Sequence, residues 1–158
     1  MGTLLANILL AFAWAVAIGE FTPANIAIGF VIAYVVLRLA SVRADRGGYF
    51  ARVGICIGFV LYFLRELVMA NIKMAYFTLS PLRSLRPAIL AVPLRDDLTD
   101  VEIMVLSSLL TLTPGTLSLD VSADRKILFV HFMHVEDADA AIREIQEGFE
   151  RRLLEVTR

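Results

Sequence analysis

Four polar side chains interrupt an otherwise apolar stretch near the middle of the sequence: Arg65, Glu66, Asn71 and Lys73. An ionisable group at membrane depth costs several kcal/mol unless it is paired or faces a wet interior, so these side chains are not expected to face lipid. On a helix, Glu66 and Lys73 share nearly one face, which continues through Tyr62, whereas Arg65 and Glu66 point about 100° apart and are not expected to pair. A carboxylate and an ammonium group on one helical face are therefore the strongest candidates for chemistry.

Two interpretations of this polar cluster remain open. In the first, Glu66 and Lys73 form part of an ion or proton path. In the second, they anchor a neighbouring subunit or extend their long side chains to the membrane interface. One carboxylate and one lysine do not form a continuous relay, so the chain alone is not expected to be a complete transporter. The second interpretation is favoured.

His131 and His134 are candidate metal ligands by residue type but not by spacing. They lie in an expected strand, where residues three apart point to opposite faces, so one cation cannot readily bind both. Both faces of this strand are apolar, which implies a cover on each side. The closing helix is expected on one side, and a partner or the membrane surface on the other. No metal site is predicted.

Other potentially reactive side chains have no partners at suitable spacing. Ser107, Ser108 and Thr111 lie on the weak polar face of a short expected helix, without the neighbouring base that nucleophilic catalysis requires. The single cysteine, Cys56, is too few for an internal disulfide or a cysteine-based metal site. The net charge of -1 and the pI near 6.1 argue against nucleic-acid binding. The sequence predicts neither an enzyme nor a cofactor site.

The composition indicates a membrane protein. Hydrophobic residues make up 58% of the chain and the mean hydropathy is +0.73, well above what soluble domains show. Apolar stretches at about 3–18, 24–40 and 51–79 predict membrane helices, and the third is the best candidate to span the bilayer. The first two are expected to form a tight hairpin around a break at residues 19–23. Small residues recur in them at four-residue spacing, which lets helix backbones approach closely. These residues are Ala11, Ala15, Gly19, Gly29 and Ala33.

The basic residues give conflicting signals about orientation. Residues 38–52 contain four arginines and one aspartate, and Arg83, Arg86 and Arg95 follow the third apolar stretch. The positive-inside rule places both basic segments in the cytoplasm. A single crossing between them cannot satisfy both placements.

The pattern changes beyond Pro81, where prolines become frequent, apolar runs shorten and charges reach globular frequency. Residues 1–84 are therefore expected to form the membrane region, and residues 85–158 a small α/β domain outside the hydrocarbon. The expected elements of this domain are a strand at 88–94, a helix opened by a Thr99–Glu102 capping box and ending near residue 112, a hairpin of 116–121 and 126–134, and an amphipathic closing helix.

The order of these elements is typical of one known layer. Strand, helix, strand, strand, helix is a βαββα (ferredoxin-like) arrangement without its final strand. The connection Thr113, Pro114, Gly115 and Thr116 suits a type II turn, because proline and glycine occupy its two central positions. We interpret this turn as structural. The predicted fold class is therefore N-terminal transmembrane helices followed by a small α/β domain.

Several segments together resemble a known family. The patterns are FTPANIAIGF, LRELVMANIKMAY, RPAILAVPL, LTLTPGTLSLDVSADRKILFVHF and GFERRLLEV, with a further segment from His131 to Asp137. They are similar to the E subunit of Mrp-type (Mnh-type) multisubunit sodium/proton antiporters, and the similarity covers nearly the whole chain. The LTLTPGTLSLDVS stretch is its most specific part.

The resemblance implies an accessory subunit of a bacterial plasma-membrane complex that exchanges sodium for protons. Its partners would be larger polytopic antiporter subunits, and its C-terminal half would be cytoplasmic. It would contribute to assembly or coupling, and it brings no catalytic motif to carry over to individual residues. The alternative is a membrane-anchored adaptor unrelated to cation transport, because an anchor joined to a small mixed domain is a generic design.

Overall fold

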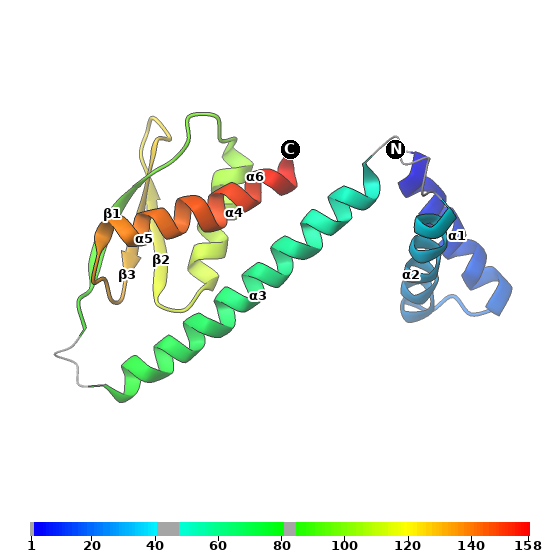
Figure 1. The fold of residues 1–158 in the computed structure, drawn as a ribbon, viewed down its shortest axis with the longest axis horizontal. Coiled ribbons are helices and arrows are strands. Elements are labelled where there is room, and N and C mark those ends of the chain that lie inside the picture. Colours follow the sequence, from blue (N-terminus) through cyan, green and yellow to red (C-terminus); the bar gives the residue numbers. More distant parts are fainter. Residues whose placement is uncertain (1, 41–47, 81–84) are drawn as a thin grey trace. The chain divides into compact units, whose positions relative to one another are not determined.

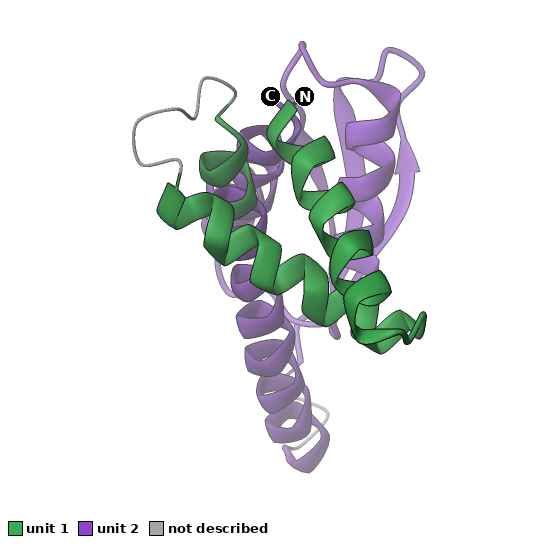
Figure 2. Cartoon of the chain, turned by 90° about the vertical axis from the view of Figure 1, so that its right-hand side faces the viewer, with its two compact units in different colours: residues 1–54 green, residues 55–158 purple. Residues whose placement is uncertain are grey.

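The computed structural model describes residues 2–40, 48–80 and 85–158. The chain divides into two compact units, Met1–Gly54 and Ile55–Arg158, shown in green and purple in Figure 2. The division falls inside helix α3 (Tyr49–Leu79), because the first turn of α3 packs with the preceding helices and its remainder packs with the C-terminal elements. This packing division is distinct from the expected end of the membrane region at residue 84, which lies outside the described residues.

The first unit is built on a hairpin of two apolar helices, α1 (Gly2–Ile18) and α2 (Pro23–Ala40) (Figure 1). Both ranges agree with the expected ones to within a residue. The turn between them uses Gly19 in the left-handed region, with φ of 78°, and Pro23 as the first residue of α2. Asn25 steadies the turn, since its Oδ1 accepts from Trp14 Nε1 at 3.2 Å and its Nδ2 donates to the Glu20 carbonyl at 2.8 Å.

Four of the five small residues named from the spacing set the distance between the two helices, whereas Gly19 is exposed in the turn. Ala11 and Ala15 of α1 are buried, as are Gly29 and Ala33 of α2. A Cβ on Gly29 would lie 2.9 Å from the Ala11 carbonyl oxygen and 2.9 Å from Trp14 Cδ1, so only glycine fits there. By length and composition, α2 and α3 could each cross a membrane, whereas α1 is slightly shorter.

Polar and aromatic contacts join the start of α3 to the hairpin within the first unit. Asn7 is fully buried and donates from Nδ2 to the Tyr49 hydroxyl at 3.0 Å. The Tyr34 and Phe50 rings meet edge to face with centroids 5.2 Å apart, and the Arg38 guanidinium lies over the Phe50 ring at 5.4 Å. Such contacts add to the stabilisation from burial alone.

The second unit contains a three-stranded antiparallel sheet in the order β1-β3-β2. Its strands are β1 (Ala88–Pro93), β2 (Thr116–Val121) and β3 (Ile127–Phe132), with helix α4 (Asp100–Leu112) between β1 and β2. Strand β3 therefore lies between the two strands that α4 connects, which is the predicted split arrangement. Among the described residues, no fourth strand pairs with β1.

The local signals of this domain behave as predicted. The Thr99 hydroxyl accepts from the Glu102 amide while the Glu102 carboxylate accepts from the Thr99 amide, completing the capping box of α4. After α4, Gly115 takes a φ of 96°, and the Thr116 amide donates to the Thr113 carbonyl at 3.2 Å. Both features fit the predicted turn.

The closing segment differs from the single amphipathic helix that the periodicity predicts. It consists of α5 (Ala138–Glu144), a π-helical segment η2 (Ile145–Glu150) and α6 (Arg151–Thr157). A π-segment accommodates a wider i→i+5 turn and often occurs at functional positions. The buried residues of this segment are Ile145, Phe149, Glu150, Leu153 and Leu154.

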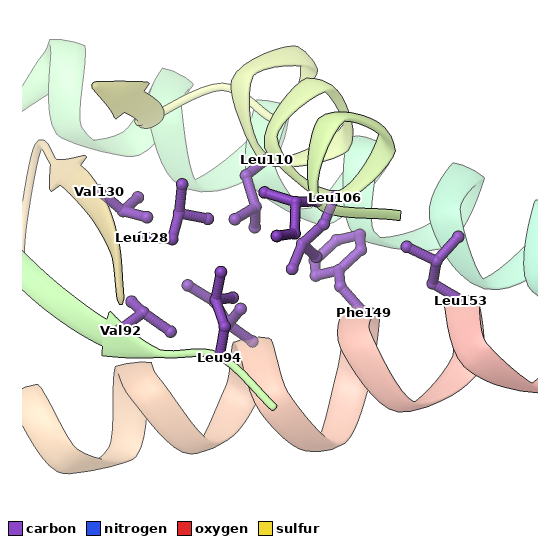
Figure 3. Packing of buried hydrophobic residues seen from close by; sticks show 10 residues of the cluster. Val92, Leu94, Leu106, Leu110, Leu128, Val130, Phe149 and Leu153 are labelled. Carbon is purple, nitrogen blue, oxygen red and sulfur yellow. The ribbon is translucent and has the colours of Figure 1, made fainter. Parts of the chain in front are cut away.

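The core of the domain lies between one face of the sheet and these helices (Figure 3). Its residues are Val92, Leu94, Ile103, Leu106, Leu110, Leu128, Val130, Ile145, Phe149 and Leu153. The opposite face of the sheet is not covered by the described chain, and Ile89, Leu117 and Leu119 remain exposed there. The second cover expected for β3 is thus not supplied by this chain's described residues.

We predict that Gly29→Ala destabilises the helical hairpin. The new methyl group would meet the Ala11 carbonyl oxygen and the Trp14 side chain, and overpacking of this kind typically costs about 1–3 kcal/mol. Thermal unfolding of the full chain in detergent, followed by circular dichroism, measures the effect. Gly58→Ala is the control, because a Cβ there meets nothing within 4 Å. Equal stability of the two variants would contradict the close packing at Gly29.

Candidate functional site: the contact between α3 and the C-terminal domain

Tyr62 of α3 makes a close contact with the C-terminal domain. The Tyr62 hydroxyl occupies the space where a Cβ on Gly148 would lie, so the contact requires glycine at 148. The Arg152 guanidinium lies 4.3 Å from the centre of the Tyr62 ring, and the Phe149 ring meets it edge to face at 5.4 Å. The ring is therefore held on three sides by residues of the closing segment.

The π-segment places these three partners beside Tyr62. Gly148 and Phe149 lie within η2, and Arg152 follows in the first turn of α6. Cation–π contacts contribute roughly 0.5–2 kcal/mol, depending on how far the charge is removed from water. Phe59 and Phe63, close to Tyr62 along the helix, also pack against the domain core. This contact depends on the aromatic face of α3 rather than on its charged residues.

A cavity of about 790 Å³ lies further along the same helix, between α3 and the domain. Its walls are largely apolar, with Met69, Phe77 and Phe132 among them. The acidic residues, lysine and histidine that line it are Glu66, Lys73, His134, Glu136, Asp137 and Glu144. Acidic groups therefore outnumber basic ones around an apolar interior.

The structure separates the four polar residues that the sequence singled out. Glu66 and Lys73 both line the cavity, in agreement with the shared face expected for them, while Arg65 and Asn71 do not. Asn71 donates from Nδ2 to the Leu67 carbonyl of its own helix at 2.7 Å. Lys73 is exposed and has no ion-pair partner among the residues that the structure describes. The expected shared face thus exists, but no salt bridge joins its two charges.

The expectation that Arg65 and Glu66 do not pair is wrong. Arg65 Nη1 lies 2.8 Å from Glu66 Oε1. The long arginine side chain bends from its own helical direction toward the neighbouring carboxylate, which the angle between their Cα–Cβ bonds does not reveal. Because the Arg65 side chain is 70% exposed, this pair contributes little to stability.

Residues of the predicted turn also line the cavity. Thr113, Pro114, Gly115 and Thr116 form part of its wall, and Gly115 lies beside the Met74 methyl group of α3, 3.7 Å from the position of a Cβ. The Thr116 hydroxyl donates to the Leu110 carbonyl at 2.6 Å and so ties the turn to the end of α4. The turn therefore shapes the surface that faces α3, in addition to connecting two elements.

His134 fixes the far end of the cavity. Its Nδ1 accepts from the Arg86 amide at 3.2 Å, its Nε2 lies 3.5 Å from Glu136, and its ring packs on Phe77 of α3 at 4.8 Å. His131 is placed differently, in β3 opposite Ile89 and Leu117. No group of three or more potential metal ligands occurs among the described residues.

Sequence reasoning missed the main contacts of this site. Tyr62 on one side, and Gly148, Arg152 and His134 on the other, come from segments distant in the sequence, and no local motif relates them. The glycine at 148 within an otherwise helical pattern was the one available signal, since glycine inside a helix often has a packing reason.

Two carboxyl groups lie where the Arg95 segment meets the closing segment, and their pKa values shift in opposite directions. Hydrogen bonds from Arg158 and Arg95 lower the pKa of Asp97 from its usual 3.8 to about 2. Burial raises the pKa of Glu150, although the Arg95 amide donates to its Oε1 at 3.0 Å and acts in the opposite direction. These groups hold the Arg95 segment against the closing segment.

Comparisons with known proteins agree with one another. The family described as Na+/H+ ion antiporter subunit matches residues 7–156. The chain is 36% identical to the Na(+)/H(+) antiporter E subunit of Alkalihalophilus pseudofirmus and 38% identical to that of Bacillus subtilis, in each case over 98% of both chains.

Two solved structures are also similar. One is a chain of the Mrp complex from a Dietzia species, with 28% identity and a TM-score of 0.51, covering 65% of this chain and 96% of that one. The other is a chain of the membrane-bound sulfane sulfur reductase, an archaeal respiratory membrane complex. It has 30% identity and a TM-score of 0.58, and the match covers 98% of both chains.

We predict that Gly148→Ala destabilises the chain and that the loss depends on Tyr62. The added methyl group would displace the Tyr62 hydroxyl, with a cost of about 1–3 kcal/mol. Thermal unfolding in detergent of Gly148→Ala, Tyr62→Ala and the double variant forms a double-mutant cycle. The cost of Gly148→Ala should largely disappear once Tyr62 is alanine. An unchanged cost in that background would show that the glycine serves another purpose.

Replacement of the two carboxyl groups should change stability with opposite signs. The folded-state pKa of Glu150 is raised, so its stabilising contribution exists below the usual 4.5 and is lost as pH rises through the raised value. Glu150→Gln should therefore raise the melting temperature at pH 7, with the gain shrinking below pH 4.5. For Asp97 the contribution exists above pH 3.8 and is lost as pH falls through about 2. Asp97→Asn should lower the melting temperature at pH 7, and the opposite order of the two variants would refute both assignments.

Proposed function

The chain belongs to the family of Na+/H+ antiporter E subunits, and we propose from this premise that it is an accessory subunit of a multisubunit monovalent cation/proton antiporter. It contributes to assembly and coupling and does not form the ion path by itself. It works in the bacterial plasma membrane, with its C-terminal domain in the cytoplasm, and it is not an enzyme.

The placement of charges is the observation that supports an accessory role. In the described parts of α1 and α2, no charged residue lies in either helix except Arg38, near the end of α2. The buried hairpin interface consists of small apolar residues and Asn7. An ion or proton path across the bilayer needs polar groups at several depths. This hairpin offers too few of them, so the path belongs to partner subunits.

The exposed sheet face supports an assembly role. Ile89, Leu117 and Leu119 are 63%, 46% and 47% exposed on the side of the sheet that the helices leave uncovered. Exposed apolar side chains on one face, here on both sides of His131, are typical of a contact with another protein. A neighbouring subunit of the complex would supply the cover that β3 lacks in this chain.

Purification of the tagged chain in mild detergent tests this function. We expect several large membrane proteins to co-purify in fixed stoichiometry, as identified by mass spectrometry. We also expect Glu66→Gln to leave the purified complex and its sodium/proton exchange in everted vesicles unchanged, because the Glu66 carboxylate pairs with Arg65 of its own helix.

We expect the same result for Lys73→Gln, since Lys73 lines the same cavity without an ion-pair partner among the described residues. A complex that stays intact with Glu66→Gln but loses exchange would place Glu66 in the ion path and overturn the assembly role. A chain that purifies alone or with soluble proteins would instead favour an adaptor.

A further inference from the structure

Helix α3 has two faces with different surroundings. Its inner face packs on the C-terminal domain through Phe59, Tyr62, Phe63 and Phe77. Its outer face is exposed along the same length. The large aliphatic side chains that remain exposed there are Ile57, Val60, Leu61, Leu64, Val68, Ile72 and Leu79. An apolar surface made of seven large aliphatic side chains must be covered by lipid or protein in the cell.

The covered inner face limits how α3 can meet a bilayer. The contacts from Phe59 to Phe77 span 18 residue steps, or about 27 Å at 1.5 Å per residue, which is close to the ~30 Å hydrocarbon thickness. If α3 crossed the membrane, the packed domain would lie at hydrocarbon depth. That domain has exposed ion pairs, such as Arg95–Asp97 and Lys126–Asp96, whose burial in lipid is costly.

The composition of the outer face favours acyl chains over another helix. Helix contacts within membranes are enriched in small residues, whereas this face consists mainly of isoleucine, leucine and valine. Its polar members Asn71 and Thr78 donate to the Leu67 and Met74 carbonyls of their own helix and so have partners without water. Arg65 and Tyr76 lie between the two faces and are both highly exposed, as expected for side chains that anchor a helix at the membrane interface.

We propose that α3 does not cross the bilayer but lies along its cytoplasmic surface, with its outer face against lipid acyl chains and the C-terminal domain on its aqueous side. The membrane crossings then come from the α1–α2 hairpin. This inference concerns the membrane topology and is independent of whether the complex exchanges sodium.

This arrangement removes the conflict between the basic segments. Arg38 and Arg52 precede most of α3, and Arg86 and Arg95 follow it. A crossing helix would put the two groups on opposite sides of the membrane, contrary to the positive-inside rule. A helix in the plane of the surface leaves both groups in the cytoplasm, and a hairpin with two crossings returns the chain to that side.

Side-specific labelling tests the topology in the assembled complex. The single cysteine is first replaced by Cys56→Ser, and then Ala51→Cys and Pro87→Cys, both at exposed positions, are introduced separately. A membrane-impermeant maleimide should label both positions in everted vesicles and neither in intact cells, with labelling in detergent as the control for reactivity. Labelling of the two positions from opposite sides would establish a crossing and overturn the proposal.

Spin labels on the outer face of α3 test whether lipid or protein covers it. Ile57→Cys, Leu64→Cys and Ile72→Cys, each in the Cys56→Ser background, should show high accessibility to oxygen and low accessibility to a water-soluble nickel chelate. All three should report a similar shallow depth, roughly 5–10 Å below the headgroups. A depth that changes steadily along the helix would indicate a crossing, and low accessibility to both reagents would indicate a partner helix. Either result would overturn the proposal.

Discussion

The close approach of Tyr62 to Gly148 is the constraint on which the second unit depends. It brings α3 against the small domain of sheet and helices. The contact lies at the π-helical segment η2 of the closing segment. Phe149 contributes to this contact and to the domain core at once, so the two are one packing unit. Because protein interiors are closely packed, a single methyl group on Gly148 would displace the Tyr62 side chain.

This contact is made by the aromatic residues of α3 and not by its charged residues. The helix presents its aromatic residues to the domain, and Glu66 and Lys73 lie next to them at the cavity wall. Glu66 forms an ion pair with Arg65, and the surrounding walls are largely apolar. An accessory subunit of an ion-exchanging complex needs such surfaces to hold partners and lipid in place, and it does not need a charged path of its own.

Much of the fold was predictable because it depends on local signals. The helix ranges followed from apolar runs, the capping box from Thr99 and Glu102, and the turn at 113–116 from its proline and glycine. The hairpin interface followed from small residues at four-residue spacing, since the helix period alone places them on one face. The Arg65–Glu66 pair was predicted wrongly, because side-chain flexibility outweighed the direction of the Cα–Cβ bonds.

The sequence by itself determined the family, the order of the elements, the apolar character of both faces of β3 and the largely apolar composition of α3. Only the tertiary structure decided which of those faces are covered. The domain covers the inner face of α3 and one face of the sheet, and it leaves the outer face of α3 and Leu117 and Leu119 exposed. The physical reason is that an apolar side chain favours burial but does not specify the surface that buries it. That surface is determined by shape complementarity between segments distant in sequence.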